Sequence, residues 1–213
     1  MLALALDTST RTTHLALRRD HHLLATTQIP PQQRHQLDLL PAIAELFNQH
    51  QLQPNDLTHL ALVTGPGSFT GLRSACAAAQ MLALTNPQLA LHPIPTLQAL
   101  ARSPRIQSVG PCAILLARKR QTAYAALVHQ AQLLTPPAVH PIDTFLNDCL
   151  QHLLYPDFSR DAAPPKPALR VLADTDLQLD LPYITQLPTA DPTHNLAPDP
   201  AAVLAILVLK RRY

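Results

Sequence analysis

The residues of this chain that could do chemistry gather in one glycine-rich segment. Three of its four glycines lie within seven residues, Gly65-Pro-Gly-Ser-Phe-Thr-Gly71, and Leu72-Arg73 follow directly. Glycine permits a positive φ angle or the close approach of another backbone. The preceding segment, Leu60–Thr64, is predicted to be a buried strand, and Phe69–Thr85 a helix. A glycine-rich turn between a strand and a helix usually binds phosphate or contacts the backbone of a second protein.

The spacing of this segment excludes the common nucleotide-binding and nucleophile motifs. A P-loop places Lys and then Ser or Thr after its last glycine, and Gly71 is followed by neither. A dinucleotide-binding turn needs a third glycine, where this chain has Thr70. It also needs an acid about 20 residues later, but no Asp or Glu occurs between Asp56 and Asp143. The nucleophile elbow G-x-S-x-G does not fit around Ser68.

Candidate catalytic and metal-binding side chains are few. The chain has a single glutamate, Glu45, so a pair of catalytic carboxylates is hard to assemble. Asp7, at the end of the first predicted strand, could hold a metal or a nucleotide through water, although an Asp in such a place more often caps a turn. His35 has no second histidine at ligand spacing. We therefore expect no catalytic residue and no metal site.

Length and net charge bound the class of protein. The 213 residues are 47% hydrophobic with a net charge of +2, which suits one large domain or two small ones and gives no overall field for nucleic acid. A long segment without acids carries Arg73, Arg102, Arg105, Arg118, Lys119 and Arg120. We expect these cations to pair with acids from elsewhere in the fold, in preference to forming a basic contact surface.

The cysteines and the two ends of the chain indicate a cytoplasmic protein without membrane contact. Cys76, Cys112 and Cys149 lack C-x-x-C spacing and are expected to be buried, reduced thiols. The apolar run Ala201–Leu209 is too short for a membrane span, which needs about 20 residues, so it is predicted to be a packed terminal helix. Asp7 comes too early for a signal peptide.

The order of predicted elements indicates a mixed α/β sheet, because a strand meander is followed by alternating strands and helices. The expected strands are Leu2–Leu6, Thr12–Arg18, His22–Ile29, Leu60–Thr64, Leu89–Ile94, Cys112–Leu116 and Thr122–Val128. The expected helices are Arg34–His50, Phe69–Thr85 with Ser68 as its cap, and a short one through Ala101 with Thr96 as its cap.

Two of these helices have more apolar surface than one sheet would cover. The first has two apolar stripes, one with Leu39, Ile43 and Leu46 and one with Leu37, Leu40, Ala44 and Phe47. The second is made of small residues all round at Ser74–Ala79, which lets helix backbones approach closely. Both helices could lie inside one large core, or they could leave a paired-helix face for another chain.

Several motifs in order resemble the TsaB (YeaZ) family. They are Asp7-Thr-Ser-Thr10 after the first strand, His35 ahead of Leu39-Leu-Pro41, the segment Gly65–Arg73, and Pro95–Leu100. The resemblance runs through about residue 130. It implies an actin-like ATPase (ASKHA) fold of class α/β, with two related halves that each have a mixed sheet flanked by helices. We expect the halves at residues 1–105, with the interface helices, and 106–213, shortened or diverged.

The resemblance also implies a function. Such a chain is a non-catalytic scaffold that binds and activates an actin-like catalytic subunit, which forms threonylcarbamoyladenosine next to the anticodon of tRNAs. An ATPase subunit joins the complex, tRNA is contacted indirectly, and the chain alone forms a homodimer. No cofactor is bound tightly, and ATP or ADP has a place only at the heterodimer junction, near Asp7 and Thr8. The implied partner interface consists of His35, Leu39, Leu40, Ile43, Phe47, Gly65, Gly67, Ser68, Phe69, Gly71, Leu72, Arg73, Ala75, Ala78, Ala79 and Leu82.

The chain departs from the family pattern in places that concern nucleotide contact. The family carries Asp-Ala-Arg before a tyrosine, but Leu116–Tyr124 contains no Asp, and the usual tail is not recognisable beyond Leu209. The turn Thr8-Ser-Thr10 has no glycine to bring N–H groups to a phosphate. The alternative hypothesis is an independent actin-like nucleotide hydrolase or small-molecule kinase, which ATP would stabilise and Asp7→Ala would inactivate. Standalone nucleic-acid binding by the acid-free segment is disfavoured, because no aromatic residues are interleaved there.

Overall fold

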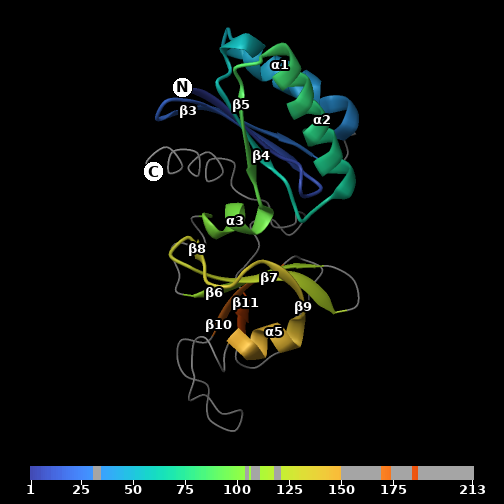
Figure 1. The fold of residues 1–213 in the computed structure, drawn as a ribbon, viewed down its shortest axis with the longest axis vertical. Coiled ribbons are helices and arrows are strands. Elements are labelled where there is room, and N and C mark those ends of the chain that lie inside the picture. The colour runs from blue at the N-terminus through green and yellow to red at the C-terminus, as the bar shows by residue number, and fades with distance from the viewer. Residues whose placement is uncertain are drawn as a thin grey trace. The chain divides into compact units, whose positions relative to one another are not determined.

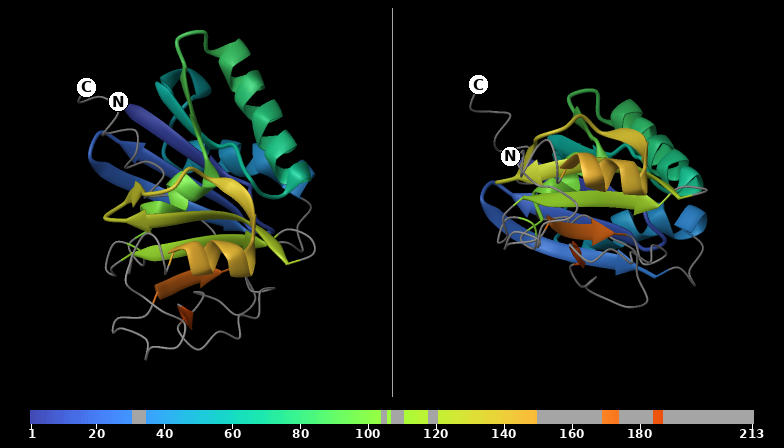
Figure 2. Two further views of the ribbon diagram at one scale, coloured as in Figure 1. Left: turned by 60° about the horizontal axis from the view of Figure 1, so that its bottom comes forward. Right: turned by 90° about the horizontal axis from the view of Figure 1, so that it is seen from below.

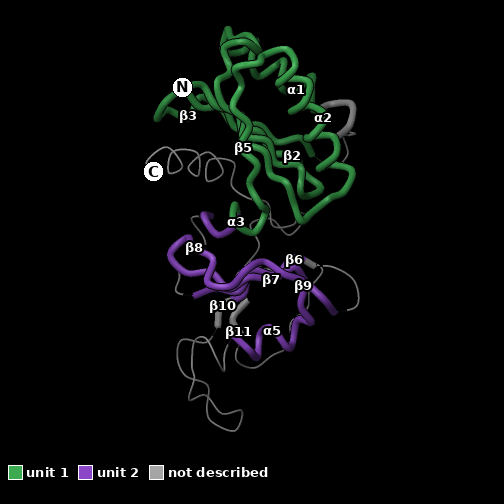
Figure 3. The backbone as a smooth tube through the Cα atoms, in the orientation of Figure 1, with its two compact units in different colours: residues 1–99, 197–213 green, residues 100–196 purple. Residues whose placement is uncertain are grey.

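The computed structural model describes residues 1–30, 35–103, 106, 111–117, 121–149, 169–173 and 184–186. Its described residues divide into two compact units between Ala99 and Leu100 (Figure 3). The boundary expected at 105/106 adjoins residues 104, 105 and 107–110, which lie outside the described residues, so that boundary stays a prediction.

The first unit is built on a five-stranded sheet in the order β3-β2-β1-β4-β5 (Figure 1). The strands are β1 (Leu2–Asp7), β2 (Thr13–Arg19), β3 (His22–Ile29), β4 (His59–Val63) and β5 (Ala90–Ile94). The first three form an antiparallel meander, while β4 pairs in parallel with β1 and β5 in parallel with β4. The helices are α1 (His35–Gln49), the short 3-10 helix η1 (Pro54–Asp56), α2 (Phe69–Thr85) and α3 (Thr96–Ala101).

Leucine and alanine alternate in β1, so one face of this sheet carries large side chains and the other face carries small ones. Successive side chains of a strand point to opposite faces. The leucines of β1, β2 and β4 join one core cluster with apolar side chains of α1 and α2, including Ile43 and Leu82. The alanines of the same strands lie in a second cluster with Val63, Ile94 and Ala99. Helices α1 and α2 lie together on the leucine face (Figure 2).

The second unit repeats the strand topology of the first. Strands β6 (Cys112–Ala117) and β7 (Thr122–His129) are antiparallel, β10 (Leu169–Ala173) is parallel to β6, and β11 (Ile184–Gln186) is parallel to β10. Short strands β8 (Gln132–Leu133) and β9 (Ala138–Pro141) pair with the far side of β7, and α5 (Ile142–Asp148) follows β9. The order β8-β7-β6-β10-β11 therefore matches β3-β2-β1-β4-β5 strand for strand, as expected of two related halves.

Most predicted elements agree with the structure to within one residue at each end, and three expectations need comment. Cys112 and Cys149 are buried, but Cys76 is exposed, so the prediction of three buried thiols is wrong for Cys76. Thr96 is the first helical residue of α3, and its buried hydroxyl accepts no bond from a described residue, so it is not a side-chain cap. The predicted helix at Ala201–Leu209 lies outside the described residues.

In the part of the chain that the structure describes, no helix combines the length and the hydropathy that a membrane span requires.

Candidate functional site

The two turns singled out by their sequence meet at one edge of the first sheet. Strands β1, β4 and β5 are parallel, so their carboxyl ends lie at the same edge, which we call the carboxyl edge. Asp7 ends β1, the glycine-rich turn follows β4, and Thr96 follows β5. Ligands of open α/β sheets are usually bound at such an edge.

Backbone hydrogen bonds join these turns to one another. The N–H of Ser68 donates to the carbonyl oxygen of Ser9 at 2.6 Å, and the N–H of Thr96 donates to that of Gly65 at 2.9 Å. The N–H of Thr64 donates to the carbonyl oxygen of Ile94 at 2.9 Å. The glycine-rich turn is therefore held by bonds to the segments that follow β1 and β5.

The glycines are explained by the close approach of the first turn. A Cβ atom on Gly67 would overlap the carbonyl oxygen of Ser9 and come within 2.6 Å of its Cβ. A Cβ on Gly71 would overlap the carbonyl oxygen of Thr8. Gly65 has φ of +105°, which side-chain-bearing residues rarely adopt. Two of the three glycines thus allow two backbone segments of the same chain to touch.

The turn also sets the start of α2. Ser68 is the N-cap, as expected, and its Oγ accepts the N–H of Gly71 at 3.2 Å. Its carbonyl oxygen accepts the N–H of Leu72 at 2.9 Å. A side-chain cap of this kind stabilises a helix by about 1 kcal/mol. Because the cap residue is itself bonded to Ser9, the position of α2 is tied to the end of β1.

Asp7 is a carboxyl group of the carboxyl edge that is almost fully buried, and the buried His14 is its partner on β2. Its Oδ1 accepts the N–H of Ser9 at 2.9 Å. Burial raises the pKa of Asp7 to about 6, and hydrogen bonding from Ser9 opposes only part of that rise. Among the described residues, four buried oxygens of this edge have no hydrogen-bond partner, namely Asp7 Oδ2, Thr8 Oγ1, Ser9 Oγ and Thr96 Oγ1.

Four backbone N–H groups of this edge are already bonded and cannot bind a phosphate as the chain stands. A phosphate turn offers backbone N–H groups to the ligand, whereas the N–H groups of Ser9, Ser68, Gly71 and Thr96 are bonded within the chain. Within the described ranges, no group of three or more His, Cys, Asp or Glu side chains is arranged to hold a metal ion. The chemistry of the edge is that of a buried carboxyl beside hydroxyls.

The structure places many of the predicted interface residues inside the chain. Leu39, Ile43, Phe47, Ala75, Ala78, Ala79 and Leu82 belong to the core cluster that α1 and α2 form with the sheet, and Gly71 is buried against Thr8. These residues position the two helices and are covered by their own chain. The side chain of His35 lies outside the described residues.

The exposed side of the two helices is made by residues outside the buried set, some of which belong to the predicted interface. Leu40, Phe69 and Arg73 are exposed as an interface requires, and Leu72, Ser68 and Gly65 are half-buried. We call the exposed apolar set with Arg73 the outer face; it consists of Leu40, Ala44, Phe69, Arg73, Cys76, Ala77, Met81 and Leu84. Phe69 is 74% exposed and Leu84 is 83% exposed. The sequence contained the signal for Met81 and Leu84, since both are large apolar residues in an otherwise small-residue helix.

Arg73 is the cation of this outer face, and it is held near the start of α2. Its guanidinium carbon lies 5.4 Å from the centroid of the Phe69 ring, a cation–π contact. Thr70, Arg73, Ser74 and Ala77 line a hollow of about 270 Å³ along the helix. The outer face therefore combines exposed apolar groups, a fixed positive charge and a hollow.

Comparisons with known proteins agree on one family. The sequence model of the family TsaD, tRNA N6-adenosine threonylcarbamoyltransferase, matches residues 26–187. The tRNA threonylcarbamoyladenosine biosynthesis protein TsaB of Bacillus subtilis is 35% identical over 104 residues, which are 48% of this chain and 45% of that protein. TsaB of Escherichia coli is 33% identical over 102 residues, 48% of this chain and 43% of that protein. The matches thus span less than half of these relatives.

Solved structures agree on the fold over nearly the whole chain. YeaZ from Pseudomonas aeruginosa superposes with a TM-score of 0.70 at 21% identity, covering 99% of this chain and 92% of that one. A crystal structure described as an uncharacterized protein with similarity to peptidase YeaZ, also from Pseudomonas aeruginosa, has a TM-score of 0.72 with the same identity and coverage. At this identity the likeness concerns the fold, and the expected α/β class with two related halves, each built on a mixed sheet, is confirmed.

Proposed function

This chain belongs to the TsaD family of tRNA N6-adenosine threonylcarbamoyltransferases, in its TsaB (YeaZ) branch, and from this premise we propose that it is a non-catalytic subunit in the synthesis of tRNA threonylcarbamoyladenosine. In this proposal it binds an actin-like catalytic subunit through the outer face of α1 and α2 and activates it. An ATPase subunit joins the pair, and ATP or ADP binds only at the junction of the two actin-like subunits.

The single observation that carries the proposal is the exposed apolar side of a helix whose position is fixed. Phe69, Met81 and Leu84 are large apolar side chains in water, and exposed apolar patches mark protein interaction sites. The hydrogen bond from Ser68 to Ser9 and the close packing of Gly67 and Gly71 hold the start of this helix. A helix so held can present its outer face without a large entropic cost on binding.

The hydrogen bonding of the carboxyl edge supports a partner over an enzyme. Four backbone N–H groups of the turns at this edge are bonded to Asp7, Ser9, Gly65 and Ser68 of this chain. A nucleotide hydrolase built on these residues would have to break those bonds to bind phosphate. The glycine motif is better explained as the support of the interface helix.

Neighbouring alanines of α2 allow a sharp test. Ala77 is exposed and Ala78 is 3% exposed, so Ala77→Arg changes the outer face while Ala78→Arg disturbs the core. We expect Ala77→Arg and Leu40→Glu to keep the thermal stability of the wild type and to abolish co-purification with the catalytic subunit of the same organism. Threonylcarbamoyladenosine formation by the reconstituted system should fall with complex formation. Gln132→Arg, an exposed change on β8 in the second unit, serves as the matched control.

Two results would contradict the proposal. If Ala77→Arg and Leu40→Glu still co-purify with the catalytic subunit and support tRNA modification, the outer face is not the interface. If Mg·ATP raises the melting temperature of the isolated chain and Asp7→Ala removes that effect, the chain is an independent nucleotide-binding protein.

A further inference from the structure

We propose that the end of the first sheet opposite the carboxyl edge contacts single-stranded RNA. This inference rests on the proposed function in tRNA modification. We call this surface the basic edge; it consists of Arg18, Arg19, His21, His22, His59 and His92. Four of these residues come from the β2–β3 hairpin and two from the beginning of β4 and the middle of β5. The proposal departs from the expectation that tRNA is contacted only indirectly.

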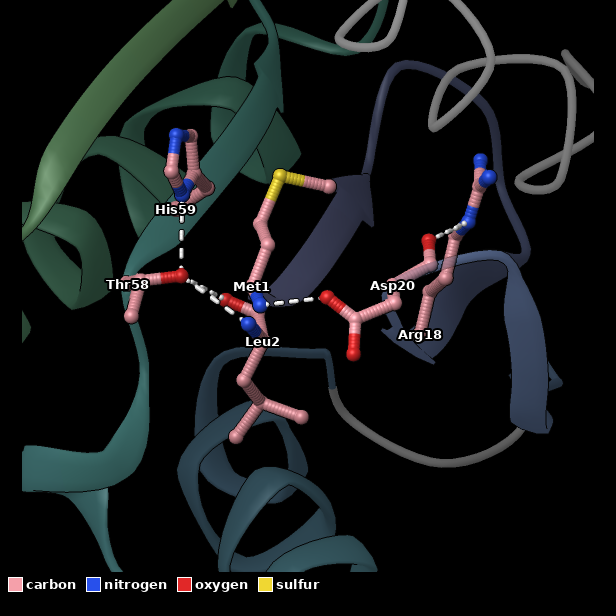
Figure 4. A network of polar contacts seen from close by, with 6 residues as sticks. All are labelled: Met1, Leu2, Arg18, Asp20, Thr58 and His59. Atoms are coloured by element: carbon pink, nitrogen blue, oxygen red, sulfur yellow. Dashed lines mark hydrogen bonds and ion pairs between the residues drawn. The ribbon is translucent and has the colours of Figure 1, made fainter.

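The hairpin holds its charged groups in fixed places. Its turn residue Asp20 has φ of +52° and is bonded twice to Met1: the N–H of Asp20 donates to the carbonyl oxygen at 2.8 Å, and the amino group of Met1 donates to Oδ1 at 2.6 Å. Arg18 Nε donates to the carbonyl oxygen of Asp20 at 2.7 Å (Figure 4). The one carboxylate of the hairpin tip is therefore paired, and its pKa is lowered, first of all by the amino group.

Pairing across the sheet brings an imidazole into line with Arg18. Ala3 of β1 is the partner of Arg18 on one side and of His59 on the other, so these three residues form one row on one face. Neighbouring strands are about 4.8 Å apart, which separates Arg18 from His59 by roughly 10 Å. Ala3 between them is fully buried, so the row meets solvent only at Arg18 and His59. Figure 4 shows Arg18 and His59 on opposite sides of Met1 and Leu2.

The imidazole is oriented and stacked. The hydroxyl of Thr58 donates to the carbonyl oxygen of Leu2 at 2.7 Å and accepts the N–H of Leu2 at 2.9 Å, and it lies 2.9 Å from His59 Nδ1. His59 stacks on His92 with ring centroids 5.2 Å apart and planes 6° from parallel. The other acid close in sequence, Asp56 of η1, accepts the N–H of Gln53 with its Oδ2 at 2.7 Å. The row thus ends in a planar, fixed pair of rings.

This combination matches the chemistry of a single RNA strand. Guanidinium groups bind phosphates, and planar side chains, histidine among them, stack with unpaired bases. Arginines alone would suit an acidic protein equally well, but an oriented ring stack at about the distance of two strands from them adds a planar group on which an unpaired base can stack. Because these contacts do not read base edges, we expect binding with little sequence preference and strong salt dependence.

The test is fluorescence anisotropy with the whole chain and a labelled anticodon stem–loop RNA from a tRNA that reads a codon beginning with A, over a range of salt concentrations. For single strands, each lost phosphate contact lowers the slope of log K against log salt by about 0.7. We expect the double variant Arg18→Ala/Arg19→Ala to weaken binding and lower this slope by roughly 1.4. His59→Ala should weaken binding about 5-fold or more and leave the slope unchanged.

The controls separate this surface from general charge and from the subunit interface. Arg73→Ala removes a cation from the outer face and should leave RNA affinity unchanged. Arg19→Glu reverses the charge of one exposed side chain at the hairpin tip and leaves the hydrogen bond of Arg18 to Asp20 in place, so it tests the effect of charge alone. All basic-edge variants should still co-purify with the catalytic subunit.

Three outcomes would overturn the inference. The first is wild-type affinity and salt slope in the Arg18→Ala/Arg19→Ala variant. The second is an equal loss of RNA affinity in Arg73→Ala. The third is a loss of co-purification of the basic-edge variants with the catalytic subunit, which would make the basic edge a protein interface. Failure of the wild type to bind a catalytic subunit would contradict the proposed function, and the RNA measurements on the chain alone would remain a separate result.

Discussion

Replacing the buried carboxyl of Asp7 by an amide tests how the carboxyl edge is built. Asp7 is 1% exposed, and burial raises its pKa from an ordinary value of 3.8 to about 6. The folded state therefore favours the protonated acid over the charged one. Asparagine in Asp7→Asn keeps an oxygen that can accept the N–H of Ser9 but cannot ionise.

The direction of the pH effect follows from the raised pKa. Between pH 3.8 and about 6 the folded chain holds a proton that the unfolded chain has released. Stability from this group is therefore complete below pH 3.8 and is lost as the pH rises through about 6. One pKa unit corresponds to about 1.4 kcal/mol, so a rise of about 2 units makes the loss about 3 kcal/mol.

The expected result is a pH-dependent difference between two proteins. At pH 8, Asp7→Asn should be more stable than the wild type by about 3 kcal/mol, and at pH 4 the two should be nearly equal. Urea unfolding followed by circular dichroism at each pH from 4 to 8 gives the difference in the free energy of unfolding. Asp20→Asn is the control of opposite sign, because the pKa of Asp20 is lowered in the fold and its loss should reduce stability at neutral pH.

Two observations would refute this reasoning. A variant that is less stable than the wild type at pH 8 would mean that partners in the folded chain stabilise the charged carboxylate of Asp7. A difference that does not change with pH would mean that Asp7 does not titrate between the two values. The same samples with Mg·ATP would distinguish the hydrolase alternative, in which the wild type gains stability and Asp7→Asn does not.

Two other substitutions test the packing of the first unit. Gly71→Ala places a Cβ against the carbonyl oxygen of Thr8. We expect the free energy of unfolding, measured by thermal unfolding, to fall by about 3 kcal/mol and the binding of the catalytic subunit to weaken. A neutral effect would contradict the close approach of the two turns. Asn86→Ala removes the side-chain amide that donates to the buried carbonyl oxygen of Leu57 at 2.7 Å. We expect the free energy of unfolding in urea to fall by about 2 kcal/mol. A change below about 0.5 kcal/mol would show that water replaces this donor.

Local structure followed from the sequence because its causes are local. Helix α2 begins and ends where it was predicted, at Phe69 and Thr85, since the Ser68 cap and the glycine-rich turn act on neighbouring residues. The predicted strands Leu2–Leu6 and His22–Ile29 agree with β1 and β3 to within one residue at each end. The family motifs were likewise readable in order along the chain.

The covering of the helices could not be derived from periodicity. Apolar spacing shows which side of a helix avoids water, but α1 and α2 each have apolar groups on more than one side, and only packing decides which side the chain itself covers. The structure buries Ile43 and Ala78 and exposes Leu40 and Ala77. Half of the sixteen predicted interface residues are therefore buried by their own chain, and the placement of the interface on α1 and α2 stays a prediction. Cys76 was misplaced for the same reason, since it lies with Ala77 on the exposed side of α2 while Ala75 is buried.

The sequence by itself determined most elements up to β7 and their order, the glycine-rich turn and the family that these motifs indicate, but not β8, β9, α5, β10 and β11. Only the tertiary structure decided which distant residues meet. The parallel pairing of β1 with β4 brings Thr8 and Ser9 against Gly67 and Gly71, and the same sheet aligns Arg18 with His59 through Ala3. Strand register sets these contacts, and for the parallel pair β1 and β4 no tight turn between the two strands fixes the register in advance.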